Sequence, residues 1–251
     1  MFRNERHEEI VRLVQKEGRV STTDLAQRFG VSEDSIRKDL QELDAAKLLQ
    51  RVYGGAVPLA ASTPHPVLAR IDSYHEQKMA IARKAFGLLE EEMTIFLDCS
   101  TTALCLADLI AASDLRLIVV STMLDIVKRA AEGRQVEVQC PGGRMNLELN
   151  GLVGAGCIRS LERVRPDIAF LGTLEVSVAE NRVSTFDAED GAVKACALEG
   201  AARSYVLADS HKFSGRGTYA YAKLTDFTGL ISDGENEEME ERARRLGIEV
   251  L

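Results

Sequence analysis

The sequence predicts an α/β protein made of two parts, a small helical amino-terminal domain and a larger α/β domain with a mainly parallel sheet. Three observations predict this arrangement. Residues 1–57 contain three blocks with helical spacing of apolar residues, residues 58–73 are low in charge and rich in proline, and residues 74–251 alternate between short β-rich runs and helical runs. We therefore expect two domains that are joined by a linker at residues 58–73.

The first block of the amino-terminal domain covers residues 6–17. It places Ile10, Leu13 and Val14 on one helical face, and Gly18 follows as a terminator. This spacing predicts an amphipathic helix whose apolar face packs against the rest of the domain.

The second and third blocks predict a helix-turn-helix at about residues 20–39. Ser21 and Asp24 form a capping pair at the start of one helix, and Gly30 ends it. Ser32 can cap the next helix. The apolar residues on these two helices are Leu25, Ala26, Phe29, Ile36, Leu40 and Leu43. A tight turn between the two helices fixes the second across the first.

The helix at residues 32–43 has the pattern of a recognition helix. Its apolar stripe leaves Arg37 and Lys38 facing outward, where Arg37 can form a bidentate pair with guanine and Lys38 can neutralise a phosphate. The hydroxyls of Ser32 and Ser35 lie at the helix start, beside free backbone amides. The alternative is an amphipathic helix with ordinary surface charges, and the surrounding three-helix pattern favours recognition of a duplex.

Residues 48–57, with the sequence LLQRVYGGAV, contain two short extended runs that predict a β-hairpin, or wing. Arg51 and Tyr53 precede Gly54 and Gly55, and a tight turn there would let Arg51 reach a minor groove or a phosphate. The alternative is a plain hairpin tip.

The charge distribution separates the two parts. The net charge of −8 argues against nucleic acid, but residues 1–57 carry 10 Lys+Arg and 10 Asp+Glu, which leaves 21 and 29 for the remainder. A neutral first domain can still present a basic stripe, whereas the acidic second domain is a poor candidate for polyphosphate binding.

Composition also limits the location and chemistry of the chain. The charged start MFRNERHEEI and the absence of any apolar run near 18 residues exclude a signal peptide and a membrane span, so we expect a cytoplasmic protein. None of the 5 cysteines lies in a CxxC pair or at metal-ligand spacing from histidine. We expect buried thiols in a reducing compartment, with no metal site and no cofactor.

The second domain is predicted to hold a small molecule at one edge of its sheet. Its helical runs are expected at about residues 74–89, 101–111, 123–132, 189–203 and 235–246, and its strands in the runs TIFL, LIVV, VEVQ, IAFL, YVLA and GLIS. Small polar residues follow these strands, in DCSTT, STM, CPGG, GT, ADSHK and SD. In open α/β sheets the ligand crevice lies beyond the carboxyl ends of the strands.

The amino-terminal pattern resembles a known family. The run STTDLAQRFGVSEDSIRKDLQELDAAKLLQRVYGGAV matches the VS..TIRRDL..L...L..R.HGGA pattern of the DeoR family of bacterial transcriptional regulators. Lys38 stands where the family usually has a second arginine, and Tyr53 where it commonly has histidine. The resemblance implies a winged helix-turn-helix over residues 1–57 that binds operator DNA. The residues that we assign to this contact are Ser32, Ser35, Arg37, Lys38, Arg51 and Tyr53.

The resemblance continues through the second domain. The segment 98–102 resembles the family's D.GTT, with Ser100 in place of glycine, and residues 141–144 match a second family segment. Residues 184–194 resemble T.D..EA.VK, and residues 208–213 resemble ADSSKF. The segment GTLE that starts at Gly172 departs from the family's GA.GI.

By this resemblance, residues 74–251 form an effector-sensing and oligomerisation domain similar to ribose-5-phosphate isomerases and CoA transferases. Lys194 and Lys212 would be cationic contacts to a phosphorylated sugar, and Asp98 and Asp209 would accept its hydroxyls. The residues assigned to the effector are Asp98, Ser100, Thr101, Thr102, Gly142, Gly143, Arg144, Gly172, Thr185, Asp187, Lys194, Asp209 and Lys212. From the residues alone, 98–102 fits an anion at a helix start or a Ser/Thr cap without a ligand, and lysines of this kind are usually just solvated.

Three functions follow from these observations. The first is a repressor of a carbohydrate operon that acts as a homodimer or homotetramer, because two DNA half-sites need two helices, and that responds to a phosphorylated sugar. The second is an isomerase-like enzyme fused to a DNA-binding domain, with acid/base groups among Asp98, Asp187, Glu189 and Lys194. The third is a DNA-binding scaffold without a ligand. The fused amino-terminal domain favours sensing over turnover, so we do not expect an enzyme.

Overall fold

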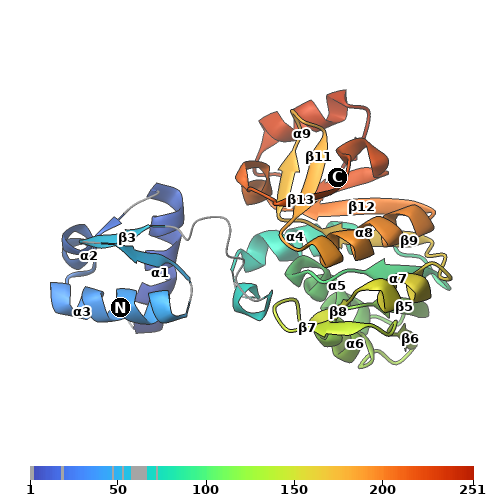
Figure 1. Ribbon diagram of the computed structural model, residues 1–251, viewed down its shortest axis with the longest axis horizontal. Coiled ribbons are helices and arrows are strands. Elements are labelled where there is room, and N and C mark those ends of the chain that lie inside the picture. Colours follow the sequence, from blue (N-terminus) through green and yellow to red (C-terminus); the bar gives the residue numbers. More distant parts are fainter. Residues whose placement is uncertain (1–2, 18–19, 47, 53, 58–66, 72) are drawn as a thin grey trace. The chain divides into compact units, whose positions relative to one another are not determined.

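The computed structural model describes residues 3–17, 20–46, 48–52, 54–57, 67–71 and 73–251. The chain divides into two compact units, Met1–His65 and Pro66–Leu251, each with its own hydrophobic core (Figure 1). Each unit is described by itself.

The first unit is a winged helix-turn-helix, as the sequence predicts. Its helices are α1 (Arg3–Glu17), α2 (Thr22–Phe29) and α3 (Glu33–Ala45), and its strands are β1 (Val20–Ser21), β2 (Gln50–Val52) and β3 (Gly55–Val57). The strands form an antiparallel sheet in the order β1-β3-β2. The β2–β3 hairpin is the predicted wing.

The apolar stripes of the three helices meet in the core of the first unit. Ile10, Leu13, Val14, Leu25, Ala26, Ile36, Leu40 and Leu43 are buried there, and Phe29 is partly buried. Helix α2 begins at Ser21, whose hydroxyl accepts from the Asp24 amide at 3.0 Å, and ends at Gly30 in the left-handed region. The predicted caps of both helices are therefore confirmed, because Ser32 also accepts the Ser35 amide at the start of α3.

The second unit is built on a parallel sheet of seven strands in the order β15-β14-β12-β9-β4-β5-β6. These strands are β4 (Thr94–Leu97), β5 (Leu117–Ser121), β6 (Val136–Gln139), β9 (Ile168–Gly172), β12 (Arg203–Ala208), β14 (Gly229–Ser232) and β15 (Glu249–Val250). All neighbouring pairs are parallel. The first six correspond to the predicted runs, and the two-residue β15 was not predicted.

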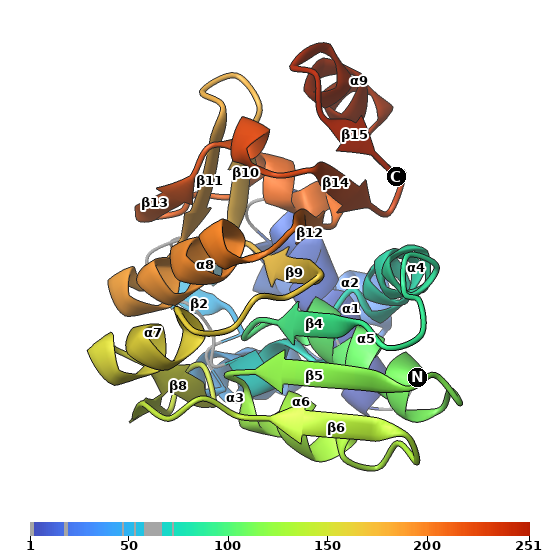
Figure 2. The same cartoon turned by 90° about the vertical axis from the view of Figure 1, so that its right-hand side faces the viewer.

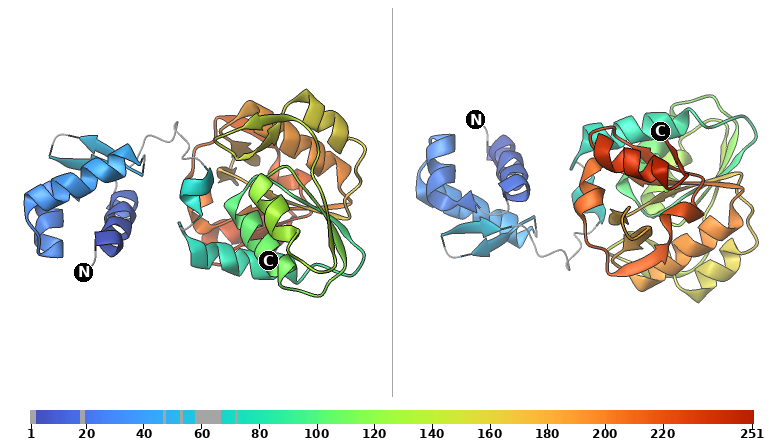
Figure 3. Two further views of the ribbon diagram at one scale, coloured as in Figure 1. Left: turned by 90° about the horizontal axis from the view of Figure 1, so that it is seen from below. Right: turned by 90° about the horizontal axis from the view of Figure 1, so that it is seen from above.

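Helices cover both faces of this sheet. They are α4 (His75–Phe86), α5 (Thr101–Ala111), α6 (Leu124–Ala130), α7 (Ala155–Leu161), α8 (Ala188–Gly200) and α9 (Glu237–Arg245). Helices α4, α5 and α6 pack together on one face, and α7 and α8 pack together on the other (Figures 2 and 3). Because both faces are covered, the central strands β4 and β9 are apolar along their lengths rather than alternating.

Shorter antiparallel strands complete the second unit, and the sequence did not predict them. They are β7 (Arg144–Asn146) paired with β8 (Gly151–Val153), and β10 (Glu175–Ser177), β11 (Arg182–Thr185) and β13 (Tyr219–Ala222) in a three-stranded sheet. Three 3₁₀ helices are Val67–Arg70, Ser210–Ser214 and Leu224–Asp226. Helix α7 was also missed.

Two expectations are corrected by the structure. The predicted linker at residues 58–73 extends too far, because residues 67–71 belong to the second unit and Val67 is fully buried in its core. The cysteines are free, but only Cys99, Cys105 and Cys157 are buried as expected. Cys140 is exposed and Cys196 is partly exposed. In the described part of the chain, no helix is long and apolar enough to cross a membrane.

Candidate functional site

The outward side of α3 carries the predicted recognition residues. Arg37 and Lys38 are exposed, and they lie between the buried stripe positions of the helix. The Ser32 and Ser35 hydroxyls are 3.0 Å apart at the helix start. Tyr53, the remaining aromatic candidate, lies outside the described residues.

The Arg37 guanidinium is held by two acids of its own helix. Its Nη2 donates to Glu33 at 2.9 Å and its Nη1 donates to Asp34 at 2.8 Å. Glu33 is itself fixed by Thr23 of α2, whose hydroxyl donates to Glu33 Oε1 at 2.8 Å. The pairing of Arg37 with these two acids was not predicted from the sequence.

The inner side of α3 is tied to α1 by a buried carboxylate. Asp39 is 2% exposed and accepts Arg6 Nε at 2.6 Å, with His7 Nε2 3.0 Å from its second oxygen. Burial would raise the pKa of Asp39, but the hydrogen bonds from Arg6 and His7 outweigh burial and lower it. This network fixes α3 against α1, which holds the opposite, exposed face in place.

The wing is shaped by its glycines. Gly54 has a φ of +78°, and a Cβ on Gly55 would lie 1.9 Å from the Val20 carbonyl oxygen, so the close pairing of β3 with β1 requires glycine. Arg51 is exposed on β2, and its backbone amide donates to Asp44 at 3.0 Å. The Arg51 side chain is therefore presented beside the hairpin turn.

In the second unit, the carboxyl ends of three neighbouring strands bring predicted residues together. Asp98 follows β4, Gly172 ends β9 and Asp209 follows β12, and these strands are adjacent in the sheet. From β4 the chain moves outward to β5 and β6, and then returns to β9 on the other side of β4. The β4–β9 boundary is thus the topological switch point, where open α/β sheets bind ligands.

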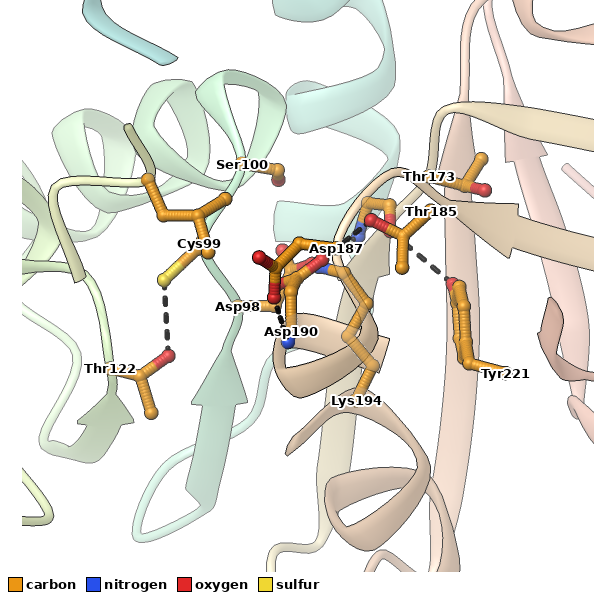
Figure 4. A network of polar contacts seen from close by, with 12 residues as sticks. Asp98, Cys99, Ser100, Thr122, Thr173, Thr185, Asp187, Asp190, Lys194 and Tyr221 are labelled. Atoms are coloured by element: carbon orange, nitrogen blue, oxygen red, sulfur yellow. Dashed lines mark hydrogen bonds and ion pairs between the residues drawn. The ribbon is translucent and has the colours of Figure 1, made fainter. Parts of the chain in front are cut away.

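A buried ion cluster occupies this point (Figure 4). Lys194 of α8, 3% exposed, pairs with Asp98 Oδ2 and lies 3.3 Å from Asp190 Oδ1. Thr185 donates to Asp190 at 2.6 Å. Burial would lower the pKa of Lys194, but the Asp190 and Asp98 carboxylates outweigh burial and raise it, so this lysine stays charged.

The strand ends approach too closely for a side chain at Gly172. A Cβ there would lie 2.4 Å from Ser100 Cβ, and the Gly172 amide donates to Asp98 Oδ2 at 2.9 Å. Asp98 is 1% exposed, yet its Oδ1 has no hydrogen-bond partner among the described residues. One oxygen of this carboxylate is therefore held by Lys194 and the Gly172 amide, and the other is buried and unsatisfied among the described residues.

The start of helix α5 lies beside this cluster. Ser100 is its N-cap and accepts the Ala103 amide at 3.1 Å, while Thr101 and Thr102 are nearly buried. Ser100 therefore caps helix α5, as one of the two alternatives expects, and the binding of an anion by residues 98–102 stays a prediction.

Cations gather at the neighbouring end of the same region. Arg70 interacts electrostatically with Asp190 and Asp98, and Lys212 interacts with Asp209 and Arg70. Lys78, 4% exposed on α4, donates from Nζ to the Arg70 carbonyl. Arg70 and Lys78 were not predicted. Arg70 was assigned to the linker, and no sequence signal shows that an isolated lysine in a helix will be buried.

Of the remaining predicted residues, Asp187 lies beside the ion cluster (Figure 4), whereas Arg144 is on the surface. Arg144 forms an exposed ion pair with Glu189 at the start of α8. Gly143 packs tightly against Cys157, and Gly142 has no atom within 4 Å of a Cβ position. Asp187 caps α8 by accepting the Asp190 amide at 2.8 Å. In the described part of the chain, no group of His, Cys, Asp and Glu side chains is arranged to hold a metal ion.

Two known sequence families match the two units. The DeoR-like helix-turn-helix domain matches residues 6–61, and the DeoR C terminal sensor domain matches residues 73–234. An uncharacterized HTH-type transcriptional regulator, FruR, of Bacillus subtilis (strain 168) is 30% identical over 94% of this chain and 93% of its own length. The HTH-type transcriptional repressor GlcR of the same organism is 29% identical over 100% and 96%.

One further curated relative and one solved structure are also similar to this chain. The glycerol-3-phosphate regulon repressor of Escherichia coli (strain K12) is 28% identical over 85% of this chain and 84% of its own. A solved ribose 5-phosphate isomerase A from Methanocaldococcus jannaschii has a TM-score of 0.42 and 19% identity, covering 56% of this chain and 55% of its own. The family matches over both units, together with the FruR likeness over nearly the whole length, show that the chain belongs to the DeoR family of DNA-binding helix-turn-helix transcriptional regulators.

Proposed function

We propose that this regulator is a repressor of a carbohydrate-metabolism operon whose operator affinity is controlled by a phosphorylated sugar. The observation that carries the proposal is the fusion of a winged helix-turn-helix to a sheet whose switch point holds charged, partly unsatisfied side chains. The relatives named glycerol-3-phosphate regulon repressor and HTH-type transcriptional repressor GlcR support it.

On DNA, α3 enters the major groove with Arg37 toward a guanine edge and Lys38 toward a phosphate. Ser32, Ser35 and Arg51 contact the sugar-phosphate backbone of the DNA. Tyr53 completes the predicted contact set. Two copies of the chain, as a homodimer or homotetramer, read the two half-sites of the operator.

The second unit supplies the sensor. Asp98 and Asp209 each have one buried oxygen without a partner among the described residues, and these oxygens accept hydroxyls of the ligand. Lys194 holds Asp98 in place, and Lys212 provides a cation at the other end. The protein acts in the cytoplasm, where operator DNA and phosphorylated metabolites meet.

The competing function is isomerase-like turnover, and the arrangement of the acids favours binding instead. Glu189 and Asp187, two of the four candidate acid/base groups, are committed to an ion pair with Arg144 and to the cap of α8. Asp98 is engaged by Lys194 and by the Gly172 amide. We therefore propose that the chain is not an enzyme; incubation with sugar phosphates is expected to yield no product.

The test measures binding of the full chain to the DNA upstream of its own coding sequence, at fixed salt and with excess competitor DNA. A panel of phosphorylated sugars is added, and we expect at least one to change the affinity by about 5–150-fold. Arg37→Ala is expected to lose specific binding. Arg12→Ala is the matched control, because Arg12 is also exposed and paired with an acid of its own helix, Glu9. Equal binding by Arg37→Ala and wild type would refute the docking.

A further inference from the structure

A nearly buried carboxylate ties two segments of the second unit together. Glu175, on β10, is 8% exposed. Its Oε2 accepts the backbone amide of Gly217 at 2.9 Å. Arg182 Nη2, on the paired strand β11, donates to Oε1 at 3.1 Å and to Oε2 at 3.3 Å. One of the two donors to this carboxylate therefore belongs to the stretch that joins the 3₁₀ helix Ser210–Ser214 to β13.

We call residues 215–217 of this stretch the glycine segment, and it approaches the small sheet closely at two points. A Cβ on Gly215 would lie 2.4 Å from the Leu174 carbonyl oxygen. A Cβ on Gly217 would lie 2.1 Å from Ser184 Cβ. Because a side chain fits at neither point, the segment lies against β10 and β11 only with glycine at both ends. The bond from Gly217 to Glu175 fixes it there.

Two residues assigned to the effector adjoin these contacts. Gly172 ends β9, three residues before Glu175. Thr185 follows Ser184 on β11, and its hydroxyl donates to Asp190 of the ion cluster at 2.6 Å. A shift of the glycine segment relative to β10 and β11 is therefore transmitted to residues beside the cluster.

Tyr221 gives the glycine segment a further connection to the same place. The segment leads into β13, which pairs with β11, and Tyr221 of β13 lies beside the ion cluster (Figure 4). Its hydroxyl donates to the Gly172 carbonyl at 3.3 Å. Burial raises the pKa of Tyr221, so the hydroxyl stays protonated and remains a donor at neutral pH. The place of Tyr221 thus depends on how the glycine segment is held.

The acceptor for the Gly217 amide is a feature of this chain. Glu175 stands where the pattern GA.GI has its second glycine, and a glycine has no side chain that could accept this amide. The pair with Arg182 has a substitute, because Arg182 Nη1 also pairs with the exposed Glu180. The contact between Glu175 and Gly217 is therefore the one to which a specific role can be assigned.

We propose that Glu175 is a positioning residue of the effector site. By holding the glycine segment on β10 and β11, it fixes Thr185 and Tyr221 against the end of β9 and so strengthens binding of the effector. This inference rests on the proposed function. It assigns Glu175 no contact with the effector itself.

The test uses the full chain and three variants. Glu175→Ala removes the acceptor, whereas Glu175→Gln keeps an amide oxygen that can accept the Gly217 amide but lacks the charge. Glu180→Gln is the matched control, because it removes an exposed acid that also pairs with Arg182. Calorimetry measures the affinity of each protein for the phosphorylated sugars of the panel.

Limited trypsin digestion followed by mass spectrometry reports on the glycine segment itself. Arg216 is exposed and lies between Gly215 and Gly217, so cleavage after Arg216 measures how readily this segment leaves the sheet. The rate at this bond is compared with the rates at the other tryptic sites of the chain. A general loss of stability raises all of these rates together.

Glu175→Ala is expected to bind sugar phosphates about 10-fold more weakly than wild type and to be cleaved selectively faster after Arg216. Glu175→Gln and Glu180→Gln are expected to resemble wild type in both measurements. Circular dichroism checks that the variants fold. If Glu175→Ala does not fold, Glu175→Gly decides the question, because it also removes the acceptor and introduces the residue of the family pattern.

Unchanged sugar-phosphate affinity in a folded variant without the acceptor would overturn the inference. An equal loss in Glu175→Gln would also overturn it, since charge rather than the Gly217 bond would then matter, and so would a loss without selective cleavage after Arg216. The proposed function fails in a different way. It fails if no sugar phosphate binds wild type or alters operator affinity, whereas the cleavage rates still decide whether Glu175 holds the glycine segment.

Discussion

At the residue scale, Arg37, the arginine that we propose contacts DNA, carries its own counter-charges. Arg37 must share or exchange its bonds to Glu33 and Asp34 when it reaches a base edge. We expect Glu33→Gln and Asp34→Asn to tighten DNA binding, because each removes a negative charge that competes with the duplex for Arg37. Exposed pairs of this kind contribute about 0.2–1 kcal/mol, so the expected gain in affinity is roughly 1.4- to fivefold.

Fluorescence anisotropy with specific and scrambled duplexes over a salt series measures this gain. Glu42→Gln, which changes an exposed acid on the same helix, is the comparison variant. If the acids compete with DNA for Arg37, Glu33→Gln and Asp34→Asn gain more DNA affinity than Glu42→Gln does. An equal gain in all three variants would show that only the net charge of the domain matters.

The buried lysine Lys194 gives a second prediction at this scale. Its replacement by Met leaves Asp98 and Asp190 buried without their cation, and breaking a buried pair in this way costs about 3–5 kcal/mol. Urea unfolding followed by circular dichroism should show this loss in the second unit. Lys128→Met, on α6 away from the cluster, should leave the urea midpoint of unfolding unchanged. A Lys194→Met protein as stable as wild type would show that the cluster does not stabilise the fold.

Lys78 predicts a pH dependence of phosphate binding. Its pKa is lowered to about 8 by burial first and by Lys212 next, with Arg70 adding to the repulsion and Cys105 and Asp209 opposing it. A bound anion favours the charged form, so binding above pH 8 must take up a proton and weakens as pH rises. We expect sulfate affinity to fall between pH 7.5 and 9.5 in wild type, by calorimetry.

Lys78→Arg keeps its charge over this range and is expected to flatten the profile. A wild-type profile that is level across this range, or one that rises with pH, would contradict a contact between Lys78 and the bound anion.

At the element scale, the close approach of β9 to the start of α5 depends on one glycine. Gly172→Ala would bring a methyl group within 2.4 Å of Ser100 Cβ, so β9 or the α5 start must shift and the Asp98 contact with the Gly172 amide is disturbed. We expect weaker sugar-phosphate binding and a lower unfolding temperature. Gly156→Ala, in helix α7, meets only the Gly143 Cα, at 4.0 Å, and is the control. Equal losses of binding and stability in both variants would contradict a specific role for the close approach at Gly172.

The elements differ in how well the sequence predicts them. Helices α2 and α3 were predictable because Ser21, Gly30 and Ser32 mark their ends, and β4 and β9 because they are short continuous apolar runs. Strands β7, β8, β10 and β15 are two or three residues long, too short for a periodic pattern. Their pairing depends on neighbours that are distant in sequence.

The candidate site was predictable in part for a similar reason. Asp98 and Asp209 follow apolar runs directly, so their position at the sheet edge follows from the parallel topology. Arg70 lies in a proline-rich stretch that reads as a linker, and only the packing of Val67 into the core brings it to the cluster. Arg144 was placed with the effector by resemblance, whereas the structure pairs it with Glu189 on the surface.

At the scale of the whole molecule, the proposed DNA binding by two copies of the chain sets a geometric requirement. Half-sites that are read on one side of the duplex lie about 34–36 Å apart, one helical turn. Inserting five base pairs, about half a turn, between the half-sites should weaken binding at least 10-fold. Inserting ten base pairs returns the half-sites to one side of the duplex and should restore part of the lost affinity. Mobility-shift assays with the three duplexes test this, and insensitivity to the spacing would argue for one copy per site.

The central claim is that one chain couples phosphate-ligand binding in the second unit to DNA binding in the first. Thermodynamic linkage makes this coupling reciprocal, so the most direct measurement is the ligand's Kd for the full chain with and without saturating operator DNA. The account predicts that DNA changes this Kd by the same factor, about 5–150-fold, by which the ligand changes operator affinity. An identical Kd in the presence and absence of operator would contradict it.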